Sequence, residues 1–405
     1  MRFLQKSAPQ SGNPKPAKAD GRLVSLDVFR GATIASMMLV NNPGSWNAVY
    51  AQLDHAEWNG WTFTDVIFPF FIWIVGVAIP LSTAKRLERG ESRQTLFWHL
   101  LRRAVILFGI GLFLGVFSYL INGSYGKAGG FSNWIGEISA HLRIPGVLQR
   151  IAVCYLVAGA IHLVTCWRTQ VLWLVALLGG YWVLMSWVPV PGQGVGLWTK
   201  EGNFSAYIDR LVLGPHTWKG MPYDPEGVVS TLPAIATCLF GVLAGQLLLI
   251  KRSAEQKTGW MFVGGNALML LGAILNIWIP INKNLWTSSY SVFMAGLAMN
   301  VFATCYWLVD VKGYRNWSRS FAIYGMNAIT VFVLAGLSGR CLMLDSGRLD
   351  AAGKTVSWKG YLYETYFVGW ISDPKLTSLL WASMYVLGLY LVAYLMYRKK
   401  LFVRF

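Results

Sequence analysis

The sequence predicts an all-α membrane protein, a polytopic bundle of about ten transmembrane helices with long extracytoplasmic loops. Of its 405 residues, 55% are apolar and only 13% are charged, whereas about 25% of the residues in soluble domains are charged. The charge-poor stretches recur at the length that an α-helix needs to cross a bilayer. A helix also satisfies its own backbone hydrogen bonds, as hydrocarbon requires.

Ten stretches have this length and composition. They are predicted at 23–41, 62–84, 100–121, 146–166, 171–188, 229–250, 259–279, 286–308, 321–342 and 376–397. The segment 358–372 is aromatic, but it is too short and too polar to span comfortably. It is therefore predicted to form an interfacial or re-entrant helix.

The distribution of Lys and Arg orients the bundle. If the N-terminus is cytoplasmic, the cytoplasmic segments hold 22 of these residues and the longer opposite connections hold 10. The positive-inside rule then places both termini in the cytoplasm. Residues 1–21 are predicted to be a disordered cytoplasmic tail, and 22–405 a single transmembrane domain. The net charge of +17 follows from membrane topology, so the bilayer and not a nucleic acid is the expected partner.

The connection between the first two predicted spans holds the most reactive group of side chains. His55 lies within ten residues of Asp54, Glu57, Asn59 and Asp65. An imidazole can take a proton from an amine or a hydroxyl, or carry an acyl group. A solvated loop histidine is the structural alternative. The sequence contains no HxxxH, HExxH, P-loop or GxGxxG pattern, so neither a metal site nor a nucleotide loop is expected.

Further polar side chains lie in or beside the predicted spans, where a charge is costly and usually faces a cavity or a partner. Asp27 and Arg30 are three residues apart and could pair on one helix face. Arg143 and Arg150 end the RIPGVLQR segment, and Asn41 ends the first span. Helix pairing or capping explains each residue alone, whereas together they indicate a polar cavity.

Ordered motifs connect these residues to a known family. The segments SLDVFRG, HAEWNGWTFTDVIFPFFIWIVG and RIPGVLQR resemble the heparan-α-glucosaminide N-acetyltransferase family of membrane acetyltransferases. The resemblance continues through VPVPG, YIDRLVLG, YDPEG, PINKNLW, DVKG, GMNAI and YRKKLF, and it covers 22–405. It implies transfer of an acetyl group from acetyl-CoA to the amine of a terminal glucosamine.

The resemblance also implies site residues. The active histidine of the family's HAxWNG motif corresponds to His55, and the asparagine that ends the first family span corresponds to Asn41. The loop between them, NPGSWNAVYAQLD, differs from that of the lysosomal members, which leaves the acceptor open. The chain looks like a bacterial relative, which implies a multi-pass protein of the inner membrane. The family also suggests a homodimer.

The predicted site has three parts. The catalytic residues are His55 and Asn41. The residues expected to bind the amino-sugar acceptor are Asp65, Asp224, Glu226, Trp58 and Asn59. The residues expected to bind the donor acetyl-CoA are Arg30, Arg143, Arg150, Asn282, Lys283 and Asn284.

Two alternatives remain open at this point. The same enzyme class could O-acetylate a periplasmic glycan or use another amino sugar. Alternatively, ten spans with embedded polar groups also suit an amino-sugar permease without acyl-transfer chemistry.

Overall fold

A computed structural model describes residues 23–122, 129–349, 353–369 and 371–403. The predicted tail, 1–21, lies outside the described residues. Each of the ten predicted spans coincides with a helix or a pair of helices. These are α1 (Val24–Asn41), α2 (Phe63–Leu87), α3 (Arg93–Ile121), α6 (Val147–Val164), α7 (Trp167–Trp187), α9 (Thr231–Leu249), α10 (Ala254–Leu275), α11 (Ser288–Tyr306), the pair α12 (Arg319–Met326) and α13 (Ala328–Leu342), and α15 (Pro374–Arg398).

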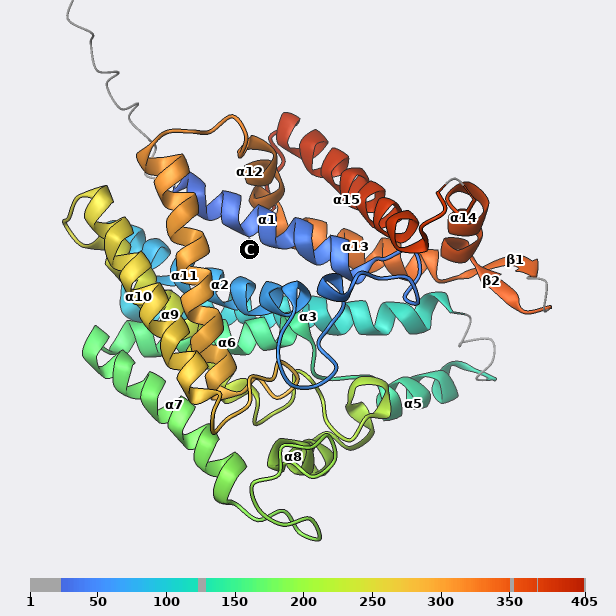
Figure 1. Cartoon of the computed structure of the whole chain (residues 1–405), viewed down its shortest axis with the longest axis horizontal. Coiled ribbons are helices and arrows are strands. Elements are labelled where there is room, and N and C mark those ends of the chain that lie inside the picture. Colours follow the sequence, from blue (N-terminus) through green and yellow to red (C-terminus); the bar gives the residue numbers. More distant parts are fainter. Residues whose placement is uncertain (1–22, 123–128, 350–352, 370, 404–405) are drawn as a thin grey trace, which may run out of the picture.

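Within the described ranges, eight helices are long and apolar enough to cross a membrane. The pair α12 and α13, bent by 77°, would make a ninth span. Helix α1 is not among them, and its first half carries Asp27 and Arg30. The prediction of an all-α polytopic bundle is thus confirmed (Figure 1).

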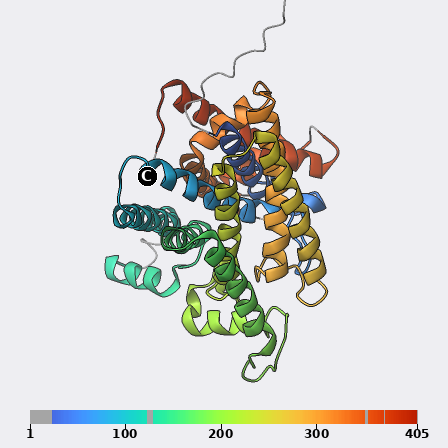
Figure 2. The ribbon, with the colours of Figure 1, turned by 90° about the vertical axis from the view of Figure 1, so that its left-hand side faces the viewer.

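Helices α2 and α9 form the centre of the bundle. In each, 72% of the most apolar 18-residue window is buried inside the protein, whereas α3 and α15 bury only 17%. The central aromatic cluster joins α1, α2 and α11, with the Phe29 and Trp73 rings 6.2 Å apart and the Trp73 and Phe302 rings 5.5 Å apart. The outer helices therefore turn apolar side chains toward the surroundings, as a protein in lipid requires. Figure 2 shows the same helices after a turn of 90°.

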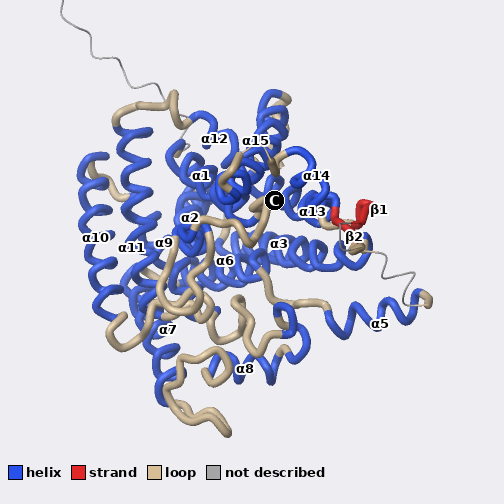
Figure 3. Tube along the Cα trace, turned by 45° about the vertical axis from the view of Figure 1, so that its right-hand side comes forward, coloured by secondary structure: helices blue, strands red, loops and turns tan. Residues whose placement is uncertain are grey.

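The connections at one end of the bundle are long and partly folded. They contain the short helices α5 (Phe131–His141), α8 (Phe204–Val212) and α14 (Trp358–Tyr366), and the antiparallel strands β1 (Asp345–Leu349) and β2 (Thr355–Ser357). Figure 3 shows the loops with α5 and α8 gathered beyond the ends of the long helices. The segment 358–372 begins with α14, whose Tyr363 ring lies 6.1 Å from that of Trp381 in α15.

The predicted span 321–342 is interrupted at Asn327. This residue has φ −119° and ψ 33°, which ends α12 before α13 begins. Its side-chain amide donates to the carbonyl oxygen of Leu401 at 3.2 Å, and its oxygen accepts from the amide of Val403 at 3.4 Å. The side-chain amide of Asn327, at the break between α12 and α13, is thus hydrogen-bonded to the chain segment that follows α15.

Two glycines let α2 and α9 approach closely. A Cβ atom on Gly76 would lie 2.0 Å from the carbonyl oxygen of Cys238, and one on Gly241 would lie 2.1 Å from that of Trp73. Both contacts involve backbone, which cannot rotate away as a side chain can. Small residues at such crossings allow the close packing that holds membrane helices together.

We therefore expect Gly241→Ala to destabilise the bundle by about 1–3 kcal/mol, because the added methyl group forces α2 and α9 apart. The matched control is Gly109→Ala in α3, where an added Cβ meets no atom within 4 Å. Thermal unfolding of the purified protein in detergent compares the two variants. Equal unfolding temperatures would contradict the proposed close contact.

Candidate active site

Two loops that are far apart in the sequence pair at the end of the bundle where α2 begins. The amide of Gly60 donates to the carbonyl oxygen of Ile281 at 2.7 Å, and the side-chain amide of Asn282 donates to Asn59 at 3.2 Å. Gly60 has φ +94°, a conformation that favours glycine. This pairing brings Lys283 beside His55.

The carboxylate of Asp65 organises the loop before α2. It is the third residue of the helix and is 1% exposed. Its Oδ2 atom accepts from the amides of Ala56 and Thr62, both at 3.0 Å, and from the Thr62 hydroxyl at 3.1 Å. Its Oδ1 atom lies 2.7 Å from Nδ1 of His55. One buried side chain therefore caps the helix and fixes the imidazole.

Lys283 completes this cluster. Its Nζ atom lies 3.8 Å from Oδ1 of Asp65, and 3.2 Å and 3.3 Å from the Nδ1 and Nε2 atoms of His55. Burial lowers the pKa of Lys283, while the negative charges of Asp65 and Glu226 oppose this effect. Lys283 was predicted among the donor-binding residues, and the structure instead places it against the predicted catalytic histidine.

The cluster has the geometry of an oriented base. An ionised carboxylate only accepts hydrogen bonds, so its contact with Nδ1 favours the tautomer in which Nδ1 carries the proton. Nε2 then keeps its lone pair. The side chain of His55 is 45% exposed, so this pair can meet a substrate from outside the bundle.

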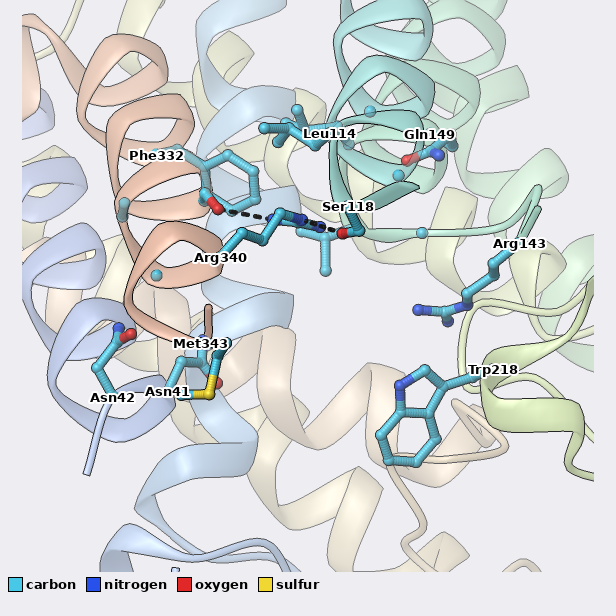
Figure 4. Close-up of a pocket in the computed structure, with 18 of the residues that line it drawn as sticks. Asn41, Asn42, Leu114, Ser118, Arg143, Gln149, Trp218, Phe332, Arg340 and Met343 are labelled. Atoms are coloured by element: carbon cyan, nitrogen blue, oxygen red, sulfur yellow. Dashed lines mark hydrogen bonds between the residues drawn. The ribbon is translucent and has the colours of Figure 1, made fainter. Parts of the chain in front are cut away.

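A cavity of about 730 Å³ opens at the same end, between the C-terminal ends of α1, α3 and α13 and the start of α6. Its polar lining comes from Asn41, Asn42, Ser118, Arg143, Gln149 and Arg340, and Trp218 closes one side (Figure 4). Arg340 donates from Nε to the Ser118 hydroxyl at 2.9 Å and from Nη1 to the carbonyl oxygen of Gly336 at 2.8 Å.

His55 is not among the residues that line this cavity. Asn41 lines the cavity, whereas His55 lies in the paired loops. At the cavity wall, Arg143 contacts Glu226.

Arg143 joins two acidic residues that were predicted to bind the acceptor. Its Nε atom donates to Asp224 at 2.8 Å, and its Nη2 atom contacts both Asp224 and Glu226. Asp224 also accepts from the amide of Trp218 at 2.7 Å. Asp224 is fully buried in this network, so it positions Arg143 and the loop around Trp218 rather than facing open space.

Several other predicted residues hold the structure together. Arg150 is buried and donates to the carbonyl oxygen of Gly227 at 3.1 Å and to the Ser230 hydroxyl at 2.5 Å. Arg30 pairs with Asp27 at 3.3 Å, as their spacing predicted, at the end of α1 away from Asn41.

The remaining predicted binding residues belong to the paired loops or their surroundings. Trp58 donates from Nε1 to the carbonyl oxygen of Trp198 at 2.7 Å. Asn282 is buried and accepts from the amide of Leu285 at 2.9 Å, and Asn284 follows Lys283 in the same turn. Across the described parts of the chain, no three His, Cys, Asp or Glu residues gather in a way that could hold a metal ion.

Sequence reasoning missed most of the cavity wall. Arg340 carried a usable signal, because a charged residue inside an apolar span usually faces a cavity or a partner. Ser118 and Trp218 carried no such signal, since their place in the wall depends on how α3 and the loop 213–228 pack.

The fold and the site define a polytopic membrane protein with an oriented His–Asp pair at one end of its bundle. No family model matches the chain. It is 31% identical over 383 residues to heparan-alpha-glucosaminide N-acetyltransferase of Homo sapiens and 31% identical over 365 residues to that of Mus musculus, covering 80% and 77% of this chain. The chain belongs to this family, and it spans about half the length of these relatives, 55% and 53%.

Replacing Asp65 with Asn should loosen the loop that carries His55. An amide offers one acceptor oxygen in place of two, so at least one of the four donors loses its partner, at a cost of about 1–3 kcal/mol. Hydrogen exchange across 54–62 should accelerate. The exposed Glu57→Gln variant is the control and should exchange at the wild-type rate. Unchanged protection in Asp65→Asn would contradict the role given to this carboxylate.

Asp209 in α8 gives a prediction for pH. Its buried carboxylate accepts from the amides of Asp224 at 3.1 Å and Val228 at 2.9 Å, yet burial raises its pKa to about 6. Because the unfolded chain releases this proton nearer pH 4, the contribution of Asp209 to stability falls as pH rises from about 4 to about 6, by up to about 3 kcal/mol.

Asp209→Asn removes this titration. Thermal unfolding is measured at pH 4 and at pH 7. Any loss of stability between pH 4 and pH 7 should therefore be smaller in the variant than in the wild type, because the variant lacks the contribution of Asp209. An identical pH dependence in both proteins would show that Asp209 does not titrate in this range.

Proposed function

We propose that this protein is a membrane-embedded acetyltransferase that moves an acetyl group from cytoplasmic acetyl-CoA to the amine of a glucosamine-type sugar on the extracytoplasmic side. Membership of the acetyltransferase family supports the reaction. The observation that carries the proposal is the 2.7 Å contact between His55 and Asp65, because it favours the tautomer in which Nε2 of an accessible imidazole carries the lone pair.

Lys283 lies against the imidazole of His55, with its Nζ atom 3.2 Å from Nδ1 and 3.3 Å from Nε2. Asp65 holds the tautomer, as the carboxylate does in other His–carboxylate pairs. The three residues then act as one unit, in which His55 touches the substrate and the other two hold the ring in place.

Two routes are consistent with this unit. In the direct route, Nε2 takes a proton from the attacking neutral amine as the amine nitrogen displaces the CoA thiolate from the acetyl carbonyl. In the covalent route, Nε2 attacks the thioester, the thiolate leaves, and the amine then takes the acetyl group from the imidazole. The released thiolate takes up the proton in either case.

The cavity is the proposed place for the donor. Its arginines, Arg143 and Arg340, are suited to phosphate groups, and the amide of Asn41 can donate to a carbonyl oxygen.

His55→Ala should abolish acetyl transfer, lowering kcat at least about 100-fold because the base or carrier is lost. Turnover is measured with labelled acetyl-CoA and glucosamine using the purified full chain in detergent. His141→Ala is the matched control, since this exposed histidine ends α5 and its ring contacts the carbonyl oxygen of Glu137 in the same helix. Retained turnover in His55→Ala would overturn the proposed role.

The same preparation separates the alternatives. Ping-pong kinetics would favour the acetyl-imidazole route, and a ternary complex would favour direct attack. Saturable uptake of glucosamine into proteoliposomes without acetyl-CoA, together with no acetyl transfer, would favour a permease. Acetylation of hydroxyl groups in preference to amines would indicate O-acetylation of a glycan.

A further inference from the structure

A second cavity lies at the other end of α2. Its volume is about 350 Å³, and its polar wall comes from Arg86 on α2, His99, Arg102 and Arg103 on α3, and Tyr155 on α6. Helix α2 has 25 residues, so at a rise of about 1.5 Å per residue its two ends are about 37 Å apart. This cavity is therefore separate from the His55 cluster and from the larger cavity beside Asn41.

The wall of this second cavity carries an excess of positive charge. Glu91 is the acidic residue that contacts the wall in the described structure, at 3.4 Å from Arg86 and 3.6 Å from His99. The guanidinium of Arg103 lies over the Tyr155 ring at 5.2 Å, and its Nε atom is buried without a hydrogen-bond partner. A buried donor of this kind costs free energy unless a ligand or water accepts from it.

Arginines near a membrane surface often extend toward water on their own. Here the arrangement differs, because Arg103 folds inward onto α6 and three helices enclose the space it faces. Planar guanidinium groups match the geometry of phosphate oxygens. Basic pockets between transmembrane helices at a cytoplasmic surface recognise phosphate head groups.

We propose that this second cavity binds a phosphate ester, held by Arg102, Arg103 and Arg86. The phosphate belongs to an anionic lipid head group or to a soluble phosphate ester. Neither kind of binding depends on the proposed acetyl transfer, whose donor is placed in the cavity beside Asn41. The predicted orientation places this end of the bundle at the cytoplasmic surface, where both are present.

Native mass spectrometry of the purified full chain tests the proposal with two probes. The lipid probe is phosphatidylglycerol, compared with phosphatidylcholine, and the soluble probe is adenosine 3′,5′-bisphosphate. In the Arg102→Gln/Arg103→Gln variant, the probe that binds should bind at least about tenfold more weakly, because two basic contacts are lost. Arg252→Gln is the matched control, since Arg252 is an exposed arginine in the loop between α9 and α10.

Arg102→Gln alone keeps the test valid if the double variant does not fold, because Arg102 is exposed. It should weaken binding about threefold or more, while Arg252→Gln should not. Preference for phosphatidylglycerol identifies a lipid site, and binding of the bisphosphate identifies a nucleotide site. The proposal is overturned if the wild type binds neither probe. It is also overturned if Arg102→Gln/Arg103→Gln and Arg102→Gln bind the probe as tightly as the control Arg252→Gln does. Since no step needs turnover, an inactive enzyme leaves this result interpretable.

Discussion

The carboxylate of Asp65 is the constraint on which the candidate site depends. It is buried at the start of α2, where the positive end of the helix dipole favours an anion, and it serves the helix cap, the loop and the imidazole together. Because these contacts share one side chain, the position of His55 is tied to the position of the helix itself. The candidate site is thus attached to α2, one of the two most buried long helices, although His55 itself is in a loop.

The bundle is closely packed at its centre and has cavities near its ends. Close packing of α2 and α9 through Gly76 and Gly241 leaves no room for a ligand between them. Both larger cavities instead are lined in part by α3 and α6, one near each end of the bundle. The described part of the bundle therefore has cavities near its ends and a closely packed middle.

The helices could be predicted from the sequence, and the shape of the candidate site could not. Each of the ten apolar stretches coincides with a helix or a pair of helices, and eight helices, or nine spans with the bent pair, are long and apolar enough to cross a membrane in the described residues. The i, i+3 spacing also predicted the pair of Asp27 with Arg30. The proximity of Lys283 to His55 depends on the pairing of loops 228 residues apart, for which no local pattern exists. For the same reason Asp224 looked like a ligand residue, although it is the partner of Arg143.

The break at Asn327 has a mechanical consequence. Its two hydrogen bonds attach the corner between α12 and α13 to the segment just after α15, and the Tyr324 hydroxyl donates to the carbonyl oxygen of Val386 on α15 at 3.1 Å. The corner and the last long helix are consequently tied together on both sides of the break. The Tyr385 hydroxyl on α15 also contacts Ser338 on α13 at 2.7 Å, so α15 braces the half of the broken helix that carries Arg340 and lines the chamber beside Asn41.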